Sequence, residues 1–195
     1  MKKDQLLSLI KFKNSVFTIK DVALLWQETR IDFVRQKLYR YLKAGKIYSI
    51  RRGIYAKDKN YSKLELATKI FTPAYISFES VLAREGVVFQ YYGQIFIASY
   101  LNRELEIDGQ KYYFKKIKNS ILTNKLGIKI VDNVFIASKE RAFLDTIYLN
   151  KEYYFDNLSS IDFEKVDKIL PIYQGNKRMT KKVEKYKKLA KEGLN

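Results

Sequence analysis

Residues 31–56 read IDFVRQKLYRYLKAGKIYSIRRGIYA, and this stretch carries the clearest fold signal in the chain. Its first half predicts a helix of about thirteen residues, roughly 20 Å long. Asp32 is placed to be the N-cap of this helix, and Gly45 stands just past its end. One side of the predicted helix is apolar, with side chains at helical spacing at Val34, Leu38, Tyr41 and Leu42.

The opposite side of this helix is polar and largely basic. At about 100° per residue it carries Asp32, Gln36, Tyr39, Arg40 and Lys43, with Arg35 at the margin. Two β-rich runs follow at residues 47–50 and 54–56, and Arg51-Arg52-Gly53 stands between them. This spacing predicts a hairpin with a three-residue loop, in which Gly53 takes the left-handed conformation and both arginines lie at the tip.

Two more helices are predicted upstream of this stretch. The first covers residues 3–10, and the second begins at Thr18, which forms a capping-box pair with Asp21. Phe17 and Val22 stand at the positions of a hydrophobic staple. Three helices and an arginine-tipped hairpin describe a winged helix-turn-helix over residues 1–60, a DNA-binding domain whose third helix enters the major groove.

Specific roles follow from the chemistry of the exposed side chains. Gln36 can pair with the N6/N7 edge of adenine, and Arg40 with guanine or phosphate. The full set of expected contacts with double-stranded DNA is Arg35, Gln36, Tyr39, Arg40, Lys43, Arg51 and Arg52. Two other interpretations remain open, because many winged-helix domains bind protein and a charged helix face is often only solvated.

Charge is distributed unevenly along the 195 residues, whose formal net charge is +17. Residues 1–60 hold 15 basic and 5 acidic side chains, residues 61–173 hold 15 and 14, and residues 174–195 hold 8 and 2. An AT-rich genome would favour a lysine-rich composition, but it would not place the charge at the two ends. This distribution favours polyanionic partners, above all nucleic acid.

Composition also excludes several classes of chemistry. The chain has no cysteine and no histidine, which rules out disulfides, thiolate zinc sites and Ser-His-Asp hydrolysis. The amino terminus does not resemble a signal peptide, and no apolar run approaches the length of a membrane span. We therefore expect a cytoplasmic protein with no membrane partner, no cofactor and no bound metal.

A mixed α/β domain is predicted for residues 61–195, after a linker at residues 57–60, so the overall fold class is α+β. Helices are expected at residues 64–71, at 78–85 with Ser77 as N-cap, from Ser138 onwards, and at 162–170. Strands are expected at residues 95–100, 104–107, 112–117, 129–131 and 134–137. Asp108-Gly109 and Asp132-Asn133 fall where hairpin turns belong.

The basic tail at residues 176–194 is a further amphipathic helix candidate. Met179, Val183, Tyr186 and Ala190 form a stripe along one side, and lysines cover the rest. Three interpretations compete: a helix docked on the body of the protein, a nucleic-acid-binding extension, and a frayed terminus. A membrane-surface helix fits less well because the apolar face is narrow.

Catalysis without histidine or cysteine would have to use carboxylates, lysine, tyrosine or carboxylate-held Mg²⁺. The candidates are Glu79, Glu85, Glu140, Arg141 and Asp145. Glu79 and Glu140 stand in first helical turns, where the helix dipole alone favours acids. Arg141 and Asp145 have the i,i+4 spacing of a structural ion pair. We therefore expect no enzymatic activity and no catalytic residue.

Three segments, taken in order, resemble the AbiEi-type antitoxins of bacterial toxin–antitoxin and phage-defence (abortive-infection) operons. They are residues 17–22 together with 42–56 (FTIKDV, LKAGKIYSIRRGIYA), residues 75–82 (YISFESVL) followed by Gly86, and residues 136–145 (IASKERAFLD). The resemblance extends from residue 14 to about residue 148. Lys139 departs from the proline usual at that position, which only preorganises a helix start.

The resemblance implies an antitoxin whose first domain represses its own promoter at inverted repeats. Its second domain would counteract a nucleotidyltransferase toxin, often without a stable complex between the two proteins. The residues that match the family's motifs in that second domain are Ser77, Glu79, Ser80, Glu140, Arg141 and Asp145. The alternative is a stand-alone winged-helix transcriptional regulator whose α/β domain senses a ligand or a protein.

Overall fold

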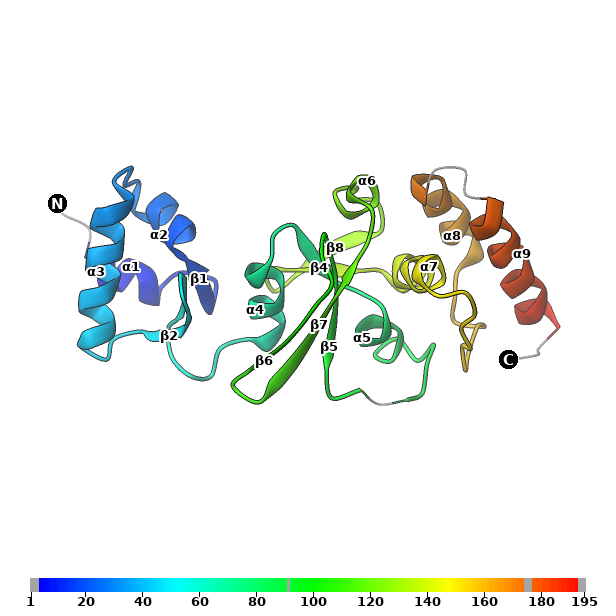
Figure 1. Ribbon diagram of the computed structural model, residues 1–195, viewed down its shortest axis with the longest axis horizontal. Helices are drawn as coiled ribbons and strands as arrows, with labels where there is room; N and C mark the ends of the chain where they lie inside the picture. The colour runs from blue at the N-terminus through cyan, green and yellow to red at the C-terminus, as the bar shows by residue number, and fades with distance from the viewer. Residues whose placement is uncertain (1–3, 91, 174–176, 193–195) are drawn as a thin grey trace. The chain divides into compact units, whose positions relative to one another are not determined.

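The computed structural model describes residues 4–90, 92–173 and 177–192, and its fold is mixed α+β (Figure 1). The chain divides into two compact units, residues 1–70 and residues 71–195. The boundary expected at residue 60 lies instead at Ile70, because the helix that follows residue 60 packs against the first strand of the first unit.

The first unit combines helices with a three-stranded antiparallel sheet of order β1-β3-β2. Its described elements are α1 (Gln5–Ile10), β1 (Val16–Thr18), α2 (Ile19–Trp26), α3 (Ile31–Lys43), β2 (Tyr48–Arg51), β3 (Ile54–Ala56) and α4 (Lys63–Ile70). The sequence did not predict β1. A three-residue strand is too short to show a period, and it exists because it pairs with β3 far along the chain.

The apolar faces of three helices meet in one core. Leu9 of α1, Val22 of α2, and Val34 and Leu38 of α3 are buried around Phe17 of β1. Each side chain of this kind contributes roughly 1.5–3 kcal/mol when it leaves water. The positions predicted to be apolar from helical spacing are therefore the positions that pack in the core of the first unit.

The predicted start of α2 is confirmed and that of α3 is corrected. Thr18 Oγ1 accepts a hydrogen bond from the Asp21 amide at 3.2 Å, and Asp21 Oδ2 accepts one from the Thr18 amide at 2.8 Å. Asp32 is not the N-cap of α3, because Arg30 occupies that position and Asp32 lies in the first turn. The carboxylate of Asp32 still favours the helix there, through its dipole.

The predicted hairpin is present, but its loop is shorter than expected. Arg51 pairs with Ile54, so only Arg52 and Gly53 remain in the loop, and Gly53 takes the expected left-handed conformation with φ +80°. The register of the ladder shifts between Ser49 and Arg51. A bulge of this kind bends the strand and strengthens its twist, which re-aims the side chains at the tip.

The second unit contains a six-stranded mixed sheet of order β6-β7-β5-β4-β9-β8. Its strands are β4 (Ala74–Ile76), β5 (Ile95–Ser99), β6 (Arg103–Ile107), β7 (Gln110–Lys116), β8 (Ile128–Val131) and β9 (Val134–Ala137). The pairs β5–β7 and β4–β9 are parallel and the other pairs are antiparallel. Positive φ angles at Asp108, Gly109, Asp132 and Asn133 confirm both predicted hairpin turns.

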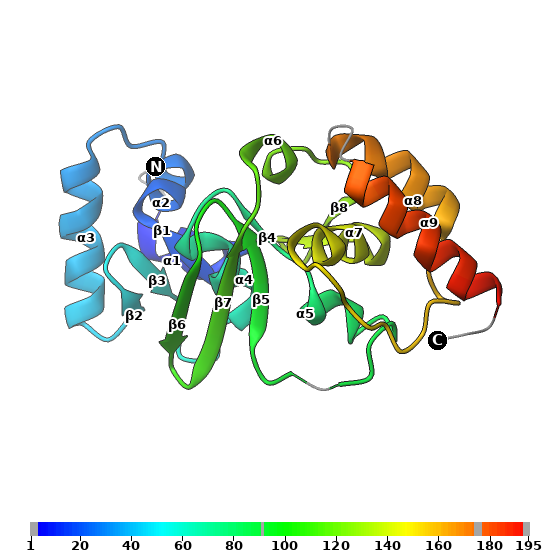
Figure 2. The ribbon, with the colours of Figure 1, turned by 45° about the vertical axis from the view of Figure 1, so that its right-hand side comes forward.

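The helices of the second unit gather around α7, whose residues 140–147 are all buried. They are α5 (Glu79–Leu82), α6 (Asn119–Leu122), α7 (Lys139–Leu149), α8 (Phe163–Ile169), a short 3₁₀ turn (Leu170–Tyr173) and α9 (Lys177–Lys191). Figures 1 and 2 show α7 between the sheet on one side and α8 and α9 on the other. Ser138 is the N-cap of α7, as predicted, and its hydroxyl accepts a hydrogen bond from the Arg141 amide.

Ser77 is not the N-cap that the sequence predicted. The residue before α5 is Phe78, which is buried and strained at φ +55°, and α5 ends at Leu82 rather than near residue 85. Phe78 can persist in this sparsely populated region only because its surroundings hold it there. The Ser77 hydroxyl is consequently free to turn toward α7.

The C-terminal helix is docked on the second unit, as one of the three interpretations of the basic tail predicts. Met179, Val183 and Tyr186 are buried, and the Tyr186 hydroxyl donates a hydrogen bond to the Tyr153 carbonyl at 2.6 Å. The rings of Tyr186 and Phe143 of α7 meet edge to face, 5.6 Å apart. None of the helices in the described part of the chain is long and apolar enough to cross a membrane.

Candidate nucleic-acid interface

Helix α3 exposes the whole of the face predicted to meet DNA. Its buried side rests on Val34 and Leu38, and the side chains that alternate with them at helical spacing point outward. The exposed residues of this face are Arg35, Gln36, Tyr39, Arg40 and Lys43. The two basic residues of the last turn, Arg40 and Lys43, also interact favourably with the helix dipole.

Three of these five side chains have local contacts, and two have no polar partner. Arg35 Nη1 lies 3.0 Å from Asp32 Oδ1 in an exposed ion pair, and such pairs contribute roughly 0–1 kcal/mol. The Lys43 ammonium lies 5.6 Å from the centre of the Tyr39 ring. Gln36 and Arg40 have no hydrogen-bond or ion-pair partner among the residues that the structure describes. Their polar groups are therefore available to a ligand.

The hairpin between β2 and β3 carries two further exposed cations. Its base is anchored, because Ile54 is buried and the Tyr55 ring stacks on Phe17 of the core with the ring centres 6.3 Å apart. Arg51 and Arg52 are exposed at the other end, and neither has an ion-pair partner within the described part of the chain. An anchored hairpin with a free guanidinium pair at its tip can bind phosphate.

The motif residues of the second unit are mostly buried in internal contacts. Arg141 and Asp145 are fully buried, and Arg141 donates hydrogen bonds to the carbonyls of Leu126 at 2.8 Å and Ile121 at 2.7 Å. It also donates to the Tyr75 hydroxyl at 2.9 Å. These guanidinium donors are therefore directed at the protein itself.

Asp145 is the acceptor at the centre of this network. Hydroxyl groups donate to its carboxylate from Tyr75 at 2.9 Å, Ser77 at 2.8 Å and Tyr173 at 2.6 Å. Burial raises the pKa of Asp145 above its ordinary value, although Arg141 and the three hydroxyl donors act in the opposite direction. Burial would lower the pKa of Arg141, but the neighbouring Asp145 carboxylate raises it. The network joins β4, α7 and the 3₁₀ turn.

Glu79 and Ser80 also have structural partners. Both carboxylate oxygens of Glu79 accept from the Lys115 ammonium, at 3.0 and 3.2 Å, and the Ser80 hydroxyl accepts from the Phe96 amide at 2.7 Å. The Lys115 ammonium also lies over the Phe96 ring, 4.5 Å from its centre. These contacts hold α5 against the sheet. They favour the structural interpretation of both residues over a catalytic one.

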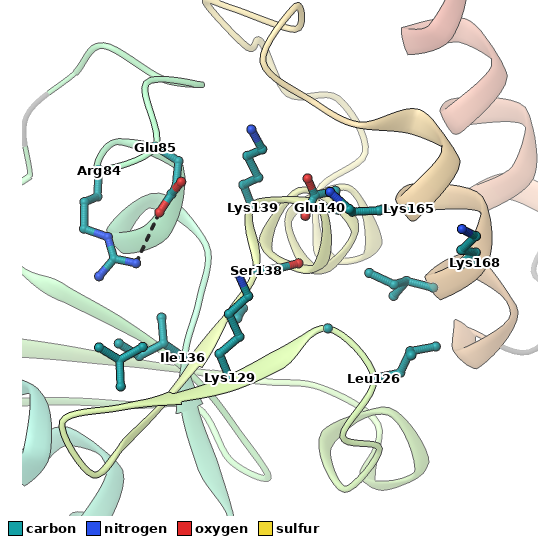
Figure 3. A pocket seen from close by; sticks show the side chains of 14 residues that line it. Arg84, Glu85, Leu126, Lys129, Ile136, Ser138, Lys139, Glu140, Lys165 and Lys168 are labelled. Carbon is teal, nitrogen blue, oxygen red and sulfur yellow. Dashed lines mark hydrogen bonds and ion pairs between the residues drawn. The ribbon is translucent and has the colours of Figure 1, made fainter.

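Glu140 differs from the other motif residues. It is 3% exposed, and its Oε1 atom has no hydrogen-bond partner among the described residues. The side chain lines a pocket of about 510 Å³ (Figure 3). Among the residues that the structure describes, no group of three or more Asp and Glu side chains could hold a metal ion.

No protein-family model matches the chain, and no curated protein matches it.

The sequence patterns did not indicate the cations that line the pocket beside Glu140. Arg84, Lys129, Lys139, Lys165 and Lys168 line it. They come from the segment after α5, from β8, from the start of α7 and from α8, so they show no common spacing in the sequence. The only sequence signal was the resemblance at residues 136–145, which marks the helix start that forms one wall.

Proposed function

We propose that the first unit is a winged helix-turn-helix that binds duplex DNA, with α3 in the major groove and the β2–β3 loop on the phosphate backbone. One observation carries this proposal: α3 exposes a polar, basic face, and two exposed arginines stand at the tip of the hairpin. Neither arginine has an ion-pair partner among the described residues. Gln36 would read the edge of adenine, and Arg40 would contact guanine or phosphate. Lys43, Arg51 and Arg52 would contact phosphate, which sets position but not sequence.

We further propose that the protein is a cytoplasmic antitoxin that represses its own operon at promoter inverted repeats and counteracts a nucleotidyltransferase toxin. The ordered resemblance of three segments to the AbiEi-type antitoxins supports this assignment: residues 17–22 with 42–56, residues 75–82 and residues 136–145. In this proposal the second unit acts by binding rather than by catalysis. The internal contacts of Glu79, Arg141 and Asp145 support that part of it, because these groups are already paired.

Binding to the DNA upstream of the gene tests the first proposal. The double substitution Arg51→Ala/Arg52→Ala should weaken binding to all sequences, whereas Gln36→Ala should mainly reduce the preference for the operator. A matched control is Arg103→Ala/Lys111→Ala, which removes two exposed cations from the sheet of the second unit. Fluorescence anisotropy with operator and scrambled duplexes measures both quantities. If both test variants bound DNA as the wild type does, α3 and the loop would not form the DNA interface.

Co-expression tests the antitoxin proposal. The full chain, and residues 71–195 alone, should restore growth when they are expressed with a toxic nucleotidyltransferase encoded next to the gene. Protection by residues 71–195 would place the antitoxic activity in the second unit. Failure of the full chain to protect would contradict the antitoxin assignment and leave DNA binding untouched.

A second candidate function is a transcriptional regulator whose second unit senses a ligand. The pocket of about 510 Å³ beside Glu140 favours it, since its volume lies within the range of about 300–1,000 Å³ that is typical of small-molecule sites. The two functions differ in the growth assay. A regulator of this kind would not rescue cells from the neighbouring gene product, and its operator affinity would change with ligand.

A further inference from the structure

The pocket beside Glu140 is built by several segments of the second unit. Ser138, Lys139 and Glu140 come from the start of α7, and the strands β8 and β9, helix α8 and the segment after α5 form the other walls. Figure 3 shows these side chains, which come from several segments of the second unit, around the opening. Its volume of about 510 Å³ suits a small molecule rather than a polymer.

The electrostatics of the pocket favour an anion. Five cations line it, against the two acids Glu85 and Glu140. Arg84 pairs with Glu85 and Lys165 pairs with Asp162, but the ammonium groups of Lys129, Lys139 and Lys168 have no ion pair among the described residues. Three lysines at one opening therefore keep their charge available to a ligand.

The start of α7 adds to this positive potential. The Ser138 hydroxyl accepts from the Arg141 amide at 3.2 Å, and within the described part of the chain no acceptor is found for the amides of Lys139 and Glu140. Unpaired amides and the helix dipole together make such a helix start a site for phosphate groups.

Glu140 shows that a simple anion would not complete the site. Its Oε1 atom is buried and has no partner among the described residues, and leaving a buried acceptor without a donor is unfavourable. Lys165, whose charge interacts with that of Glu140, is hydrogen-bonded to Asp162 instead. Because Glu140 lines the pocket, we expect a ligand that fits to bring a hydrogen-bond donor for its carboxylate as well as a negative charge for the lysines.

Apolar side chains supply the remaining surface. Leu126 and Val131 are 48% and 45% exposed, and both lie in the pocket wall together with Ile136. Partly exposed apolar groups beside a cationic opening provide a surface that a planar ring can cover. The wall therefore favours a ligand with an aromatic ring in addition to its charge and its donor group.

We propose that this pocket binds a mononucleotide, with its phosphate at the start of α7 among the unpaired lysines, and its ring against the apolar wall. A ribose hydroxyl or a base amine would donate to Glu140. The alternative is a solvated lysine cluster next to a glutamate that is present only to stabilise its helix, and that alternative predicts no preference for a nucleotide over phosphate. This proposal concerns the second unit and does not depend on DNA binding by the first.

Calorimetric titration of the full chain with AMP, GMP, CMP and UMP, and with inorganic phosphate as the reference anion, tests the proposal. At least one nucleotide should bind roughly tenfold or more tightly than phosphate, because ring burial and the hydrogen bond to Glu140 add to the shared charge interaction. Equal binding of phosphate and all four nucleotides would overturn the proposal.

Variants separate the three parts of the site. Lys139→Ala/Lys168→Ala should weaken nucleotide binding roughly tenfold or more, whereas Lys181→Ala/Lys185→Ala, two cations on α9, should leave it unchanged. Glu140→Gln should reduce the advantage of the nucleotide over phosphate without weakening the binding of phosphate. Unchanged affinity in the pocket pair, or an equal loss in the α9 pair, would show that no built site exists. These titrations do not measure operator binding, so the nucleotide proposal and the DNA-binding proposal can be contradicted independently of each other.

Discussion

Arg141 and Asp145, one helical turn apart on α7, form an ion pair in which neither side chain is exposed, with Arg141 Nε and Asp145 Oδ1 3.3 Å apart. Removing two charges from water is costly, and the attraction within the pair offsets that cost only where the other donors and acceptors are also satisfied. Here the hydroxyl groups of Tyr75, Ser77 and Tyr173 donate hydrogen bonds to the Asp145 carboxylate. The ion pair is therefore part of a connected hydrogen-bond network.

Loss of the Asp145 charge should destabilise the second unit strongly. We expect Asp145→Asn to lower the free energy of unfolding by about 3–5 kcal/mol, because Arg141 would be left buried without a counter-charge. Urea denaturation followed by far-UV circular dichroism measures the change. Asp162→Asn at the half-buried N-cap of α8 is the control, because asparagine caps a helix about as well as aspartate. A stable Asp145→Asn protein that no longer protects cells would mean that the pair has a functional role.

Glu65 should be essential for the stability of the first unit, although it lies beyond the predicted domain boundary. Its buried Oε2 atom accepts hydrogen bonds from the Ser15 amide at 2.8 Å, the Ser15 hydroxyl at 2.6 Å and the Val16 amide at 3.2 Å. Glu65→Ala should therefore cost about 3 kcal/mol, since it leaves buried donors unpaired. Trp26, the single tryptophan of the chain, lies in α2 and reports unfolding of the first unit by its fluorescence.

The control for Glu65→Ala is Asp58→Ala, an exposed acid that should leave the transition nearly unchanged. The same hydrogen bonds predict that a fragment of residues 1–70 is more stable than one of residues 1–60. Equal stability of the two fragments would contradict the role given to α4.

Acid should weaken the first unit through Asp21. Burial raises the pKa of Asp21, but the Lys69 ammonium at 2.8 Å and the Thr18 amide outweigh it and hold the pKa below its ordinary value of 3.8. Because the folded-state pKa is the lower one, this contribution to stability is present above pH 3.8 and is lost as the pH falls through the folded value. Trp26 fluorescence during urea denaturation at a series of pH values measures it.

Asp21→Asn is the matched variant for this pH series, since asparagine retains a capping oxygen but does not titrate. The stability difference between wild type and variant should shrink as the solution becomes more acidic than the ordinary pKa of aspartate. A difference that is constant with pH would show that the Asp21–Lys69 pair contributes nothing.

DNA binding should depend steeply on salt. For a duplex, the logarithm of the binding constant falls by about 0.9 per decade of salt for each phosphate that is neutralised. Arg51→Ala/Arg52→Ala should therefore reduce the slope by about 0.9 for each phosphate that the variant no longer neutralises. Gln36→Ala should leave the slope unchanged, because a neutral amide releases no counterion. Anisotropy titrations at several salt concentrations give the slopes. An unchanged slope in the arginine variant would show that the loop does not contact the phosphate backbone.

Much of the local structure was predictable from short spans of sequence. The capping box at Thr18, the turns at Asp108-Gly109 and Asp132-Asn133, and the N-cap at Ser138 all depend on interactions within a few residues. The exposure of the α3 face followed from helical spacing alone. The errors at Asp32 and Ser77 concern helix starts, where neighbouring residues compete for one capping position.

Contacts between distant segments were beyond the reach of those patterns. Strand β1 exists because it pairs with β3, and Glu65 belongs to the first unit because its carboxylate faces Ser15, 50 positions earlier. Tyr75 reaches Asp145 across 70 positions, and Tyr173 reaches it from the other direction.

Periodicity and turn chemistry thus specify elements and surfaces, since the forces involved act along a few residues of one segment. Which charged side chains become buried, and which of them surround an open pocket, depends on how separate segments meet. Glu140 and Asp145 illustrate this dependence: both are acids of the same helix, and packing closes a hydrogen-bond network around Asp145 while it leaves an oxygen of Glu140 without a partner among the described residues.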